Sequence, residues 1–257
     1  MKPLVVLPYK DPQGMMTGHL QNILPQLKQT FSKAIISITE DTLDFQRPHI
    51  DWILNDDFFQ TSLVPAKIPV GDHFRSLYKH AVNACSPEQI LHLCFVDRVA
   101  FALGNGYRVQ FIADVQAVRP EHTPLIFQRS DTAWNTHPQI YRDLESIATR
   151  AGEVFFQKSL DFAWCHLAIQ AGQLMAILPQ IKSHDLSMVG EIILLILDTV
   201  KTKDVDWLSW EDPFILSCDP VKLKQERETS KPEMEKRLSY MIPILQLIYQ
   251  KSRGKLE

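Results

Sequence analysis

The stretch LVVLPYKDPQGMMTGHLQNILPQLKQTFSKAIISIT, residues 4–39, has two apolar runs separated by an amphipathic segment. LVVLP (4–8) and KAIISIT (33–39) are short and rich in β-branched residues, which is typical of strands buried in a parallel sheet. Between them, apolar side chains recur at helical spacing: Leu20, Ile23, Leu24, Leu27 and Phe31. Pro25 falls inside this segment and indicates a kink or a late helix start. The stretch therefore predicts a β-α-β unit and, with it, a parallel sheet.

Strand and helix patterns continue to alternate after this unit. PLIFQRSD (124–131) is expected to be a strand that ends in polar residues. Helices are expected at 71–85, 137–152, 160–178, 187–200 and about 232–251. In the helix at 137–152, Pro138 marks the start and Gly152 lies just past the end. Residues 42–70 carry three prolines and are expected to be irregular. The alternation predicts the α/β class.

The composition is ordinary for a globular protein. The 257 residues suffice for one large domain, and 45% hydrophobic with 22% charged residues is a soluble balance. The net charge of −3 argues against a general nucleic-acid binder, which carries a basic surplus. In KLKQERETSKPEMEKR (222–237) bases alternate with acids, which indicates a solvated helical surface.

The cysteines and the apolar segments bear on the cellular compartment. The 4 cysteines form no CxxC pair, and three of them lie among apolar residues, which favours free thiols in a reducing compartment. The first apolar run is too short for the core of a signal peptide. EIILLILDTV (191–200) is about half a membrane span and contains Glu191 and Asp198, so it is expected to be a core helix. We therefore expect a cytoplasmic protein without a membrane span.

ILHLCFVDRVAFAL (90–103) is an apolar run interrupted only by Asp97 and Arg98. As a single helix it would point apolar side chains in every direction and leave Asp97 without a solvated face. As a strand over about 90–96 followed by a helix from about 98, it places both charges at the junction. There Asp97 either caps the helix or faces a ligand, and neither role buries an unpaired charge. The second arrangement is favoured.

The carboxyl ends of the predicted strands carry polar residues. Ligands of open parallel sheets bind outside these ends, so the residues that follow 4–8, 33–39 and 90–96 are candidates for a binding site. Neither a G-x-G-x-x-G after the first strand nor a G-x-x-x-x-G-K-[ST] occurs. These absences disfavour a dinucleotide-binding Rossmann module and a P-loop.

Three further blocks resemble a known family. HLCFVDR (92–98), RSDTAWNTHPQIYRDLES (129–146) and DFAWCHLA (161–168) are similar to blocks of uncharacterised bacterial proteins related to the GT-A-fold glycosyltransferases, and the similarity spans about residues 90–213 plus the first strand. The resemblance implies a three-layer sandwich with a mostly parallel central sheet flanked by helices. It also implies a single GT-A-like domain over 1–257, in which 1–130 is the nucleotide-binding half and 131–257 is the acceptor-side half with the C-terminal helices.

In this family a central strand ends in Asp-x-Asp, whose carboxylates hold Mg²⁺ or Mn²⁺ on the diphosphate of the nucleotide-sugar. This sequence has Phe95-Val96-Asp97 at that place. Asp97 is thus the remaining metal ligand, and Phe95 puts binding of the metal in doubt. A guanidinium also balances phosphate charge, so Arg98 is expected to compensate in part.

The resemblance assigns roles to further residues. Nucleotide-sugar contacts are expected from Tyr9, Asp11, Glu40, Asp97 and Arg98, and substrate contacts from Arg129, Asp131 and His137. In WLSWEDP (207–213), Glu211 and Asp212 are candidates for the base that deprotonates an acceptor hydroxyl. Each group of residues also has a purely structural interpretation. The residues after the first two strands form a polar turn or loop, those near Pro138 cap a helix, and 207–213 holds buried tryptophans before a turn.

The sequence therefore predicts a nucleotide-sugar-binding protein that transfers a sugar, as a hexosyltransferase does, to a small acceptor. Its partners are these small molecules, with no nucleic acid, and a homodimer is compatible with this role. One alternative is a non-catalytic GT-A-like protein that binds a ligand or a partner. An α/β enzyme unrelated to this family is the other.

Overall fold

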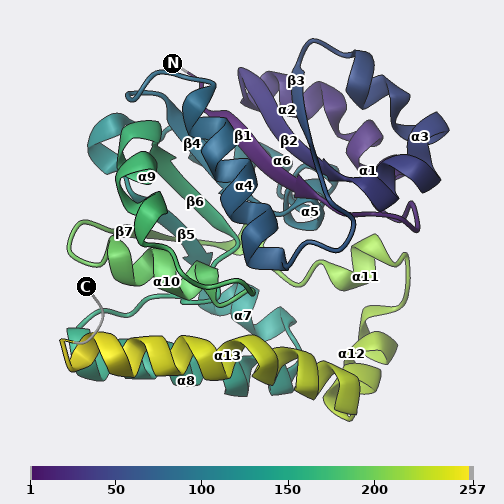
Figure 1. Ribbon diagram of the computed structural model, residues 1–257. Coiled ribbons are helices and arrows are strands. Elements are labelled where there is room, and N and C mark those ends of the chain that lie inside the picture. The colour runs from purple at the N-terminus through teal and green to yellow at the C-terminus, as the bar shows by residue number, and fades with distance from the viewer. Residues whose placement is uncertain (1, 255–257) are drawn as a thin grey trace.

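The computed structural model describes residues 2–254, which form a seven-stranded sheet with helices on both faces (Figure 1). The strands are β1 (Leu4–Tyr9), β2 (Lys33–Thr39), β3 (Phe59–Val64), β4 (Ile90–Cys94), β5 (Leu125–Arg129), β6 (His166–Gln170) and β7 (Lys201–Val205). Their order in the sheet is β3-β2-β1-β4-β6-β5-β7. β6 is antiparallel to both of its neighbours, and every other adjacent pair is parallel. The predicted α/β class with a mostly parallel central sheet is confirmed.

The predicted β-α-β unit forms at the amino end of the chain. β1 and β2 pair in parallel along their whole lengths, and two short helices, α1 (Thr17–Asn22) and α2 (Leu24–Thr30), connect them. Pro25 lies in the first turn of α2, where its missing N–H costs no intrahelical hydrogen bond. The proline therefore divides the predicted helix in two.

Two helical layers cover the sheet, because alternate side chains of its strands point to opposite faces. Val5 and Leu7 pack on one face with α1, α2, α3 (Glu40–Asn55), α5 (Val96–Gly104) and α6 (Arg108–Gln116). Leu4 and Val6 pack on the other face with α4 (Val70–Asn83), α9 (Ala171–Ile177) and α10 (Met188–Leu195). The result is the predicted three-layer sandwich.

Two long helices lie outside these layers. α8 (Gln139–Phe156) and α13 (Lys231–Ser252) run side by side, and α13 also packs on α10 (Figure 1). Shorter elements complete the fold: α7 (Asp131–Thr136), α11 (Asp212–Ile215), α12 (Pro220–Glu228) and 3₁₀ turns at Pro120–His122, Leu178–Gln180 and Asp206–Leu208. Within residues 2–254, no helix has the length and apolar character that crossing a membrane requires.

Some predicted elements were wrong. Residues 42–70 are not irregular, since they contain most of α3 and all of β3. Residues 160–178 are not one helix, because the apolar run includes β6, a central strand buried on both faces whose pattern is hard to distinguish from that of a buried helix. Gly152 does not follow the end of α8 but lies inside it, where a Cβ would stand 2.6 Å from the Phe162 ring. β7 was not predicted because its residues are mostly polar and exposed.

Candidate functional site

A cavity of about 580 Å³ opens at the carboxyl edge of the sheet. Its walls include Tyr9 at the end of β1, the residues just after β4, and Cys165 just before the antiparallel β6. α12 and α13 supply the opposite wall. This is the position at which open α/β sheets bind ligands, and the volume suits a small molecule.

The junction at 90–103 has the predicted strand-then-helix form. β4 ends at Cys94 and α5 begins at Val96, so Asp97 and Arg98 lie in the first turn of the helix. Phe95, and not Asp97, occupies the N-cap position. The Asp97 carboxylate accepts the backbone N–H of Arg98 at 2.8 Å and lines the cavity, and its charge there is favourable at a helix N-terminus.

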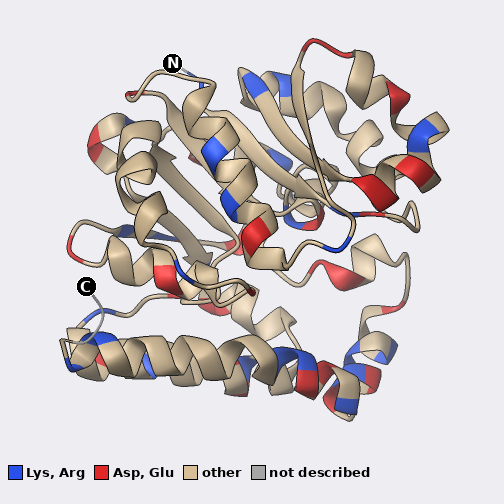
Figure 2. Ribbon diagram, in the orientation of Figure 1, with Lys and Arg blue, Asp and Glu red and all other residues tan. Residues whose placement is uncertain are grey.

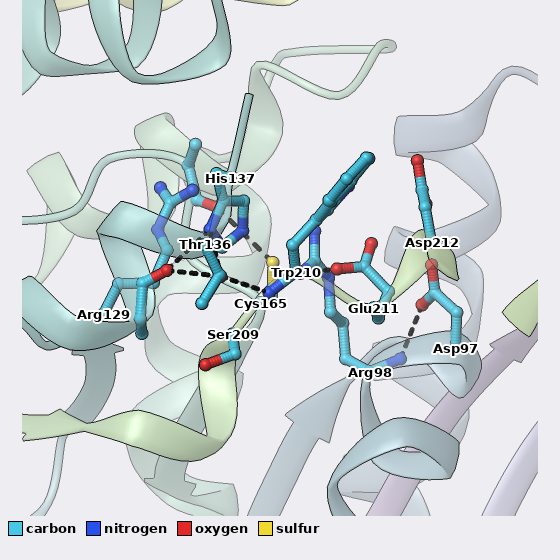
Figure 3. Close-up of polar contacts among 12 residues, drawn as sticks. Asp97, Arg98, Arg129, Thr136, His137, Cys165, Ser209, Trp210, Glu211 and Asp212 are labelled. Carbon is cyan, nitrogen blue, oxygen red and sulfur yellow. Dashed lines mark hydrogen bonds and ion pairs between the residues drawn. The ribbon is translucent and has the colours of Figure 1, made fainter. Parts of the chain in front are cut away.

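The Arg98 side chain pairs with an acidic side chain of the protein itself. Its guanidinium forms an ion pair with Glu211, whose side chain is buried, while that of Arg98 is 12% exposed (Figure 3). Burial raises the pKa of Glu211 to about 7, against the opposing attraction of Arg98. The charge of Arg98 is therefore already partly balanced before any ligand binds.

Glu211 and Asp212 have different environments although they are adjacent. Glu211 is 4% exposed and faces Arg98, whereas Asp212 begins α11 with a side chain that is 29% exposed. Both line the cavity (Figure 3). Among residues 2–254, the Asp212 carboxylate has one salt-bridge contact, a long one of 3.7 Å to Arg227 of α12. Of the two predicted catalytic acids, Asp212 is the one available to a ligand.

Tyr9 and Asp11 lie at the end of β1, but their polar groups serve the following loop. Asp11 is buried and accepts the backbone N–H groups of Met15, Met16 and Thr17 at 2.8, 2.8 and 3.1 Å. The Tyr9 hydroxyl lies 2.7 Å from Thr17 Oγ1 and donates to Asp11 at 3.2 Å. Tyr9 lines the cavity and Asp11 does not. Asp11 thus shapes the loop that borders the cavity.

Arg129 forms a clamp inside the protein. Its guanidinium donates two hydrogen bonds of 2.8 Å to Asp161 and makes an ion pair of 2.7 Å with Glu145. It also lies 3.7 Å from the centre of the Trp134 ring. Arg129 borders the cavity, but these contacts engage all three of its guanidinium nitrogens, so its position indicates that it holds β5 and α8 together.

Three other predicted contact residues lie away from the cavity wall. Glu40 is exposed at the start of α3, and Asp131 is exposed in the first turn of α7. His137 is buried, with Nδ1 2.9 Å from the Ala133 carbonyl, and its Nε2 has no hydrogen-bond partner among residues 2–254. Burial, and then the charges of Arg129 and Arg98, hold the pKa of His137 well below its usual range. The structure does not bring these three residues together.

The C-terminal helices contribute to the cavity, which the sequence does not predict. The charge pattern of 222–237 indicates a solvated surface, but Arg227, Lys236 and Arg237 line the cavity. Arg237 pairs with Glu145 at 2.8 Å and lies 3.7 Å from the centre of the Tyr141 ring. Alternating charges on a helix give no sign of which ones face a distant sheet edge, so no sequence signal could have selected these residues.

The residues at the degenerate motif do not fit a divalent cation. Phe95, in place of the first acid, packs on Phe74 with ring centres 5.4 Å apart. Asp97 belongs to no group of three ligand side chains that could hold a metal ion: within residues 2–254, the only such group is His92, Cys94 and His166. That group is buried in the core and is not part of the cavity wall.

The fold is that of an α/β protein with a cavity of about 580 Å³ at the carboxyl edge of its sheet. A scan against protein-family models found no match, and a search of curated proteins found no significant relative. The function is therefore argued from the site.

Proposed function

We propose that the protein binds a nucleotide-sugar in this cavity and transfers the sugar to a small acceptor. The observation that carries the proposal is that Asp97 and Asp212, far apart in sequence, line one cavity at the carboxyl edge of the sheet. They are the acids that the family resemblance assigns to the donor side and the acceptor side. The β1-α1-α2-β2 unit followed by a central strand with an acid after its end is also the arrangement that the resemblance implies.

In an inverting transfer the acceptor hydroxyl oxygen attacks the anomeric carbon of the sugar. The bond from that carbon to the diphosphate oxygen breaks, and its electron pair leaves with the nucleoside diphosphate. A carboxylate takes the hydroxyl proton. Of the two neighbouring acids, Asp212 is the more exposed and its contact to Arg227 is long, at 3.7 Å, so we assign it this role. Glu211 is a positioning residue, because its ion pair with Arg98 holds the chain just before Asp212.

Calorimetric titration with a panel of nucleotide-sugars, with and without Mn²⁺, tests the proposal. We expect one of them to bind wild type, and Asp97→Ala to weaken this binding. Asp212→Asn should bind the donor about as well as wild type but release no nucleoside diphosphate when monosaccharide or polyol acceptors are added. Asp198→Asn, a change at an exposed residue outside the cavity, is the matched control. If no nucleotide-sugar binds, the proposal is wrong.

The second candidate is a non-catalytic binding protein of the same fold. The replacement of an acid by Phe95 and the commitment of Glu211 to Arg98 favour it. Tight donor binding with no release of nucleoside diphosphate in the presence of any acceptor supports this candidate over the first.

The cysteines bear on where the protein works. All four are free thiols, and one of them, Cys218, is exposed. Exposed thiols persist in reducing compartments, which supports the cytoplasm as the proposed location.

A further inference from the structure

The diphosphate of a nucleotide-sugar needs positive charge around it, and the degenerate motif does not provide this through a metal. Asp97 is the only acid of the motif, and Phe95 is part of an apolar cluster. The positive charge that faces the cavity must therefore come from side chains.

The cavity wall has a surplus of such side chains. Six cations face four carboxylates there, although the whole chain has a net charge of −3. The cations are Lys10, Arg98, Arg129, Arg227, Lys236 and Arg237, and the carboxylates are Asp97, Glu145, Glu211 and Asp212. A concave surface with excess positive charge favours an anionic ligand.

Five of these cations have a carboxylate oxygen within 4.0 Å, and three of the five are arginines with largely buried side chains. Arg98 pairs with Glu211, Arg129 with Asp161 and Glu145, and Arg237 with Glu145. Their contacts join α5, α8 and α13 to the rest of the fold. A ligand would have to displace a buried partner to use them fully, which is costly.

Lys236 and Arg227 are better placed to bind a ligand. Lys236 is exposed and forms no salt bridge within residues 2–254, although its charge acts on Glu233. Arg227 pairs with the buried Glu233 and lies 3.7 Å from Asp212, but its side chain is 25% exposed, more than that of Arg98, Arg129 or Arg237. A guanidinium has five N–H donors in a fork that matches phosphate oxygens, and a lysine adds a point charge.

The two cations act on the same carboxylate, Glu233, with which Arg227 forms an ion pair. Burial tends to raise the pKa of Glu233, but a hydrogen bond from Tyr141 and the charges of Lys236, Arg227 and Arg237 lower it below its usual range. All three cations therefore surround one carboxylate. Figure 2 shows basic and acidic residues gathered on α12 and the first turns of α13, across from the carboxyl edge of the sheet.

We propose that Arg227 in the last turn of α12 and Lys236 in α13 form a diphosphate subsite, which holds the donor without a divalent cation. This proposal rests on the proposed function, because it names how the same cavity binds the charged part of its donor. In this proposal Arg227 and Lys236, and not Arg98, balance the charge of the diphosphate, because the Arg98 guanidinium pairs with Glu211.

Titration with inorganic pyrophosphate and with uridine, guanosine and adenosine diphosphates tests the subsite, in EDTA and in Mn²⁺. We expect binding of equal strength in both conditions. Losing a charge-assisted hydrogen bond costs about tenfold or more in affinity, so Lys236→Ala and Arg227→Met should each weaken binding by that factor. Lys222→Ala, on the same helix as Arg227 but outside the cavity, should leave it unchanged.

The subsite proposal is wrong if EDTA abolishes binding of the diphosphates. It is also wrong if Lys236→Ala and Arg227→Met both bind them with wild-type affinity, or if none of these probes binds wild type. Because Lys236 is exposed and forms no salt bridge within residues 2–254, we expect Lys236→Ala to fold. A loss of affinity in this variant can therefore be attributed to the missing charge. The two proposals fail separately. If diphosphates bind in a way that depends on Lys236 but no nucleotide-sugar binds, the subsite is supported and the transferase proposal is wrong. If nucleotide-sugars bind both variants as tightly as they bind wild type, the transferase proposal stands and the subsite is wrong.

Discussion

Arg98 in the first turn of α5 and Glu211 just before α11 form a buried ion pair across the edge of the sheet. The pair connects the end of β4, next to Asp97, to the segment that carries Asp212 (Figure 3). Removing one partner of such a pair leaves a buried charge without compensation.

We expect the two residues to be strongly coupled in a double-mutant cycle of Arg98→Met and Glu211→Gln. Contacting charges couple by about 1–3 kcal/mol, and at pH 8 Glu211 is ionised because its pKa is about 7. Urea unfolding at pH 8 should show that the double variant loses less stability than the two single losses together. At pH 5 Glu211 is protonated, and the coupling should shrink.

The exposed pair Lys231–Glu235, at 3.5 Å within α13, is the matched control for this cycle. Its coupling should stay below about 0.5 kcal/mol because solvent screens it. A coupling of Arg98 to Glu211 as small as this at pH 8 would contradict the ion pair.

Acid should destabilise the protein through Glu145. Burial raises the pKa of this carboxyl, but Arg129 and Arg237 together outweigh burial and lower it to about 2, from 4.5 in the unfolded chain. The stabilisation is therefore complete above about pH 4.5 and is lost as the pH falls from there toward 2. At neutral pH it amounts to about 3 kcal/mol.

Urea unfolding of Glu145→Gln between pH 7 and pH 3 measures this contribution. The variant should be less stable than wild type at pH 7, and the difference should narrow as the pH falls. Glu235→Gln, at an exposed site on α13, should follow wild type throughout. A constant gap between Glu145→Gln and wild type over this range would argue against the depressed pKa.

Arg129→Met separates a structural role from a ligand-binding one. The change leaves the buried carboxylates of Asp161 and Glu145 without their shared cation, which should cost about 3–5 kcal/mol of unfolding free energy. Thermal or urea unfolding gives the loss directly. If the variant instead keeps its stability and loses only affinity for the donor, Arg129 is the substrate contact that the sequence predicted.

Gly71→Ala should destabilise the start of α4. A Cβ at this position would lie 2.6 Å from the backbone carbon of His184 and 2.7 Å from the Asp185 carbonyl oxygen. Backbone atoms cannot move aside as a flexible side chain can, so we expect a cost of about 1–3 kcal/mol or more in urea unfolding.

Gly18→Ala provides the control for this change, because a Cβ there meets nothing within 4 Å. Gly18 lies in α1, so alanine should be neutral or should stabilise by up to about 1 kcal/mol. Equal stability of the two alanine variants would contradict the close approach at Gly71.

The local parts of this fold were predictable from sequence because they depend on short-range periodicity. The β-α-β unit, the class, and the strand-to-helix junction at Asp97 all follow from the spacing of apolar residues within a few turns or strands. The errors occurred where that signal is ambiguous. β6 is too apolar to alternate, and β7 is too polar to resemble a strand.

The composition of the site depended on contacts that no local pattern encodes. Charged residues after the central strands could be predicted from the sequence, since a buried strand must end where charges can be solvated or paired. Which of those charges remain available to a ligand depends on the packing of distant segments. Packing joins Arg98 to Glu211 and Arg129 to Asp161, while Lys236 reaches the cavity without a described carboxylate partner. The physical reason is that an ion pair depends on distance in space, and the sheet edge brings together residues that are far apart along the chain.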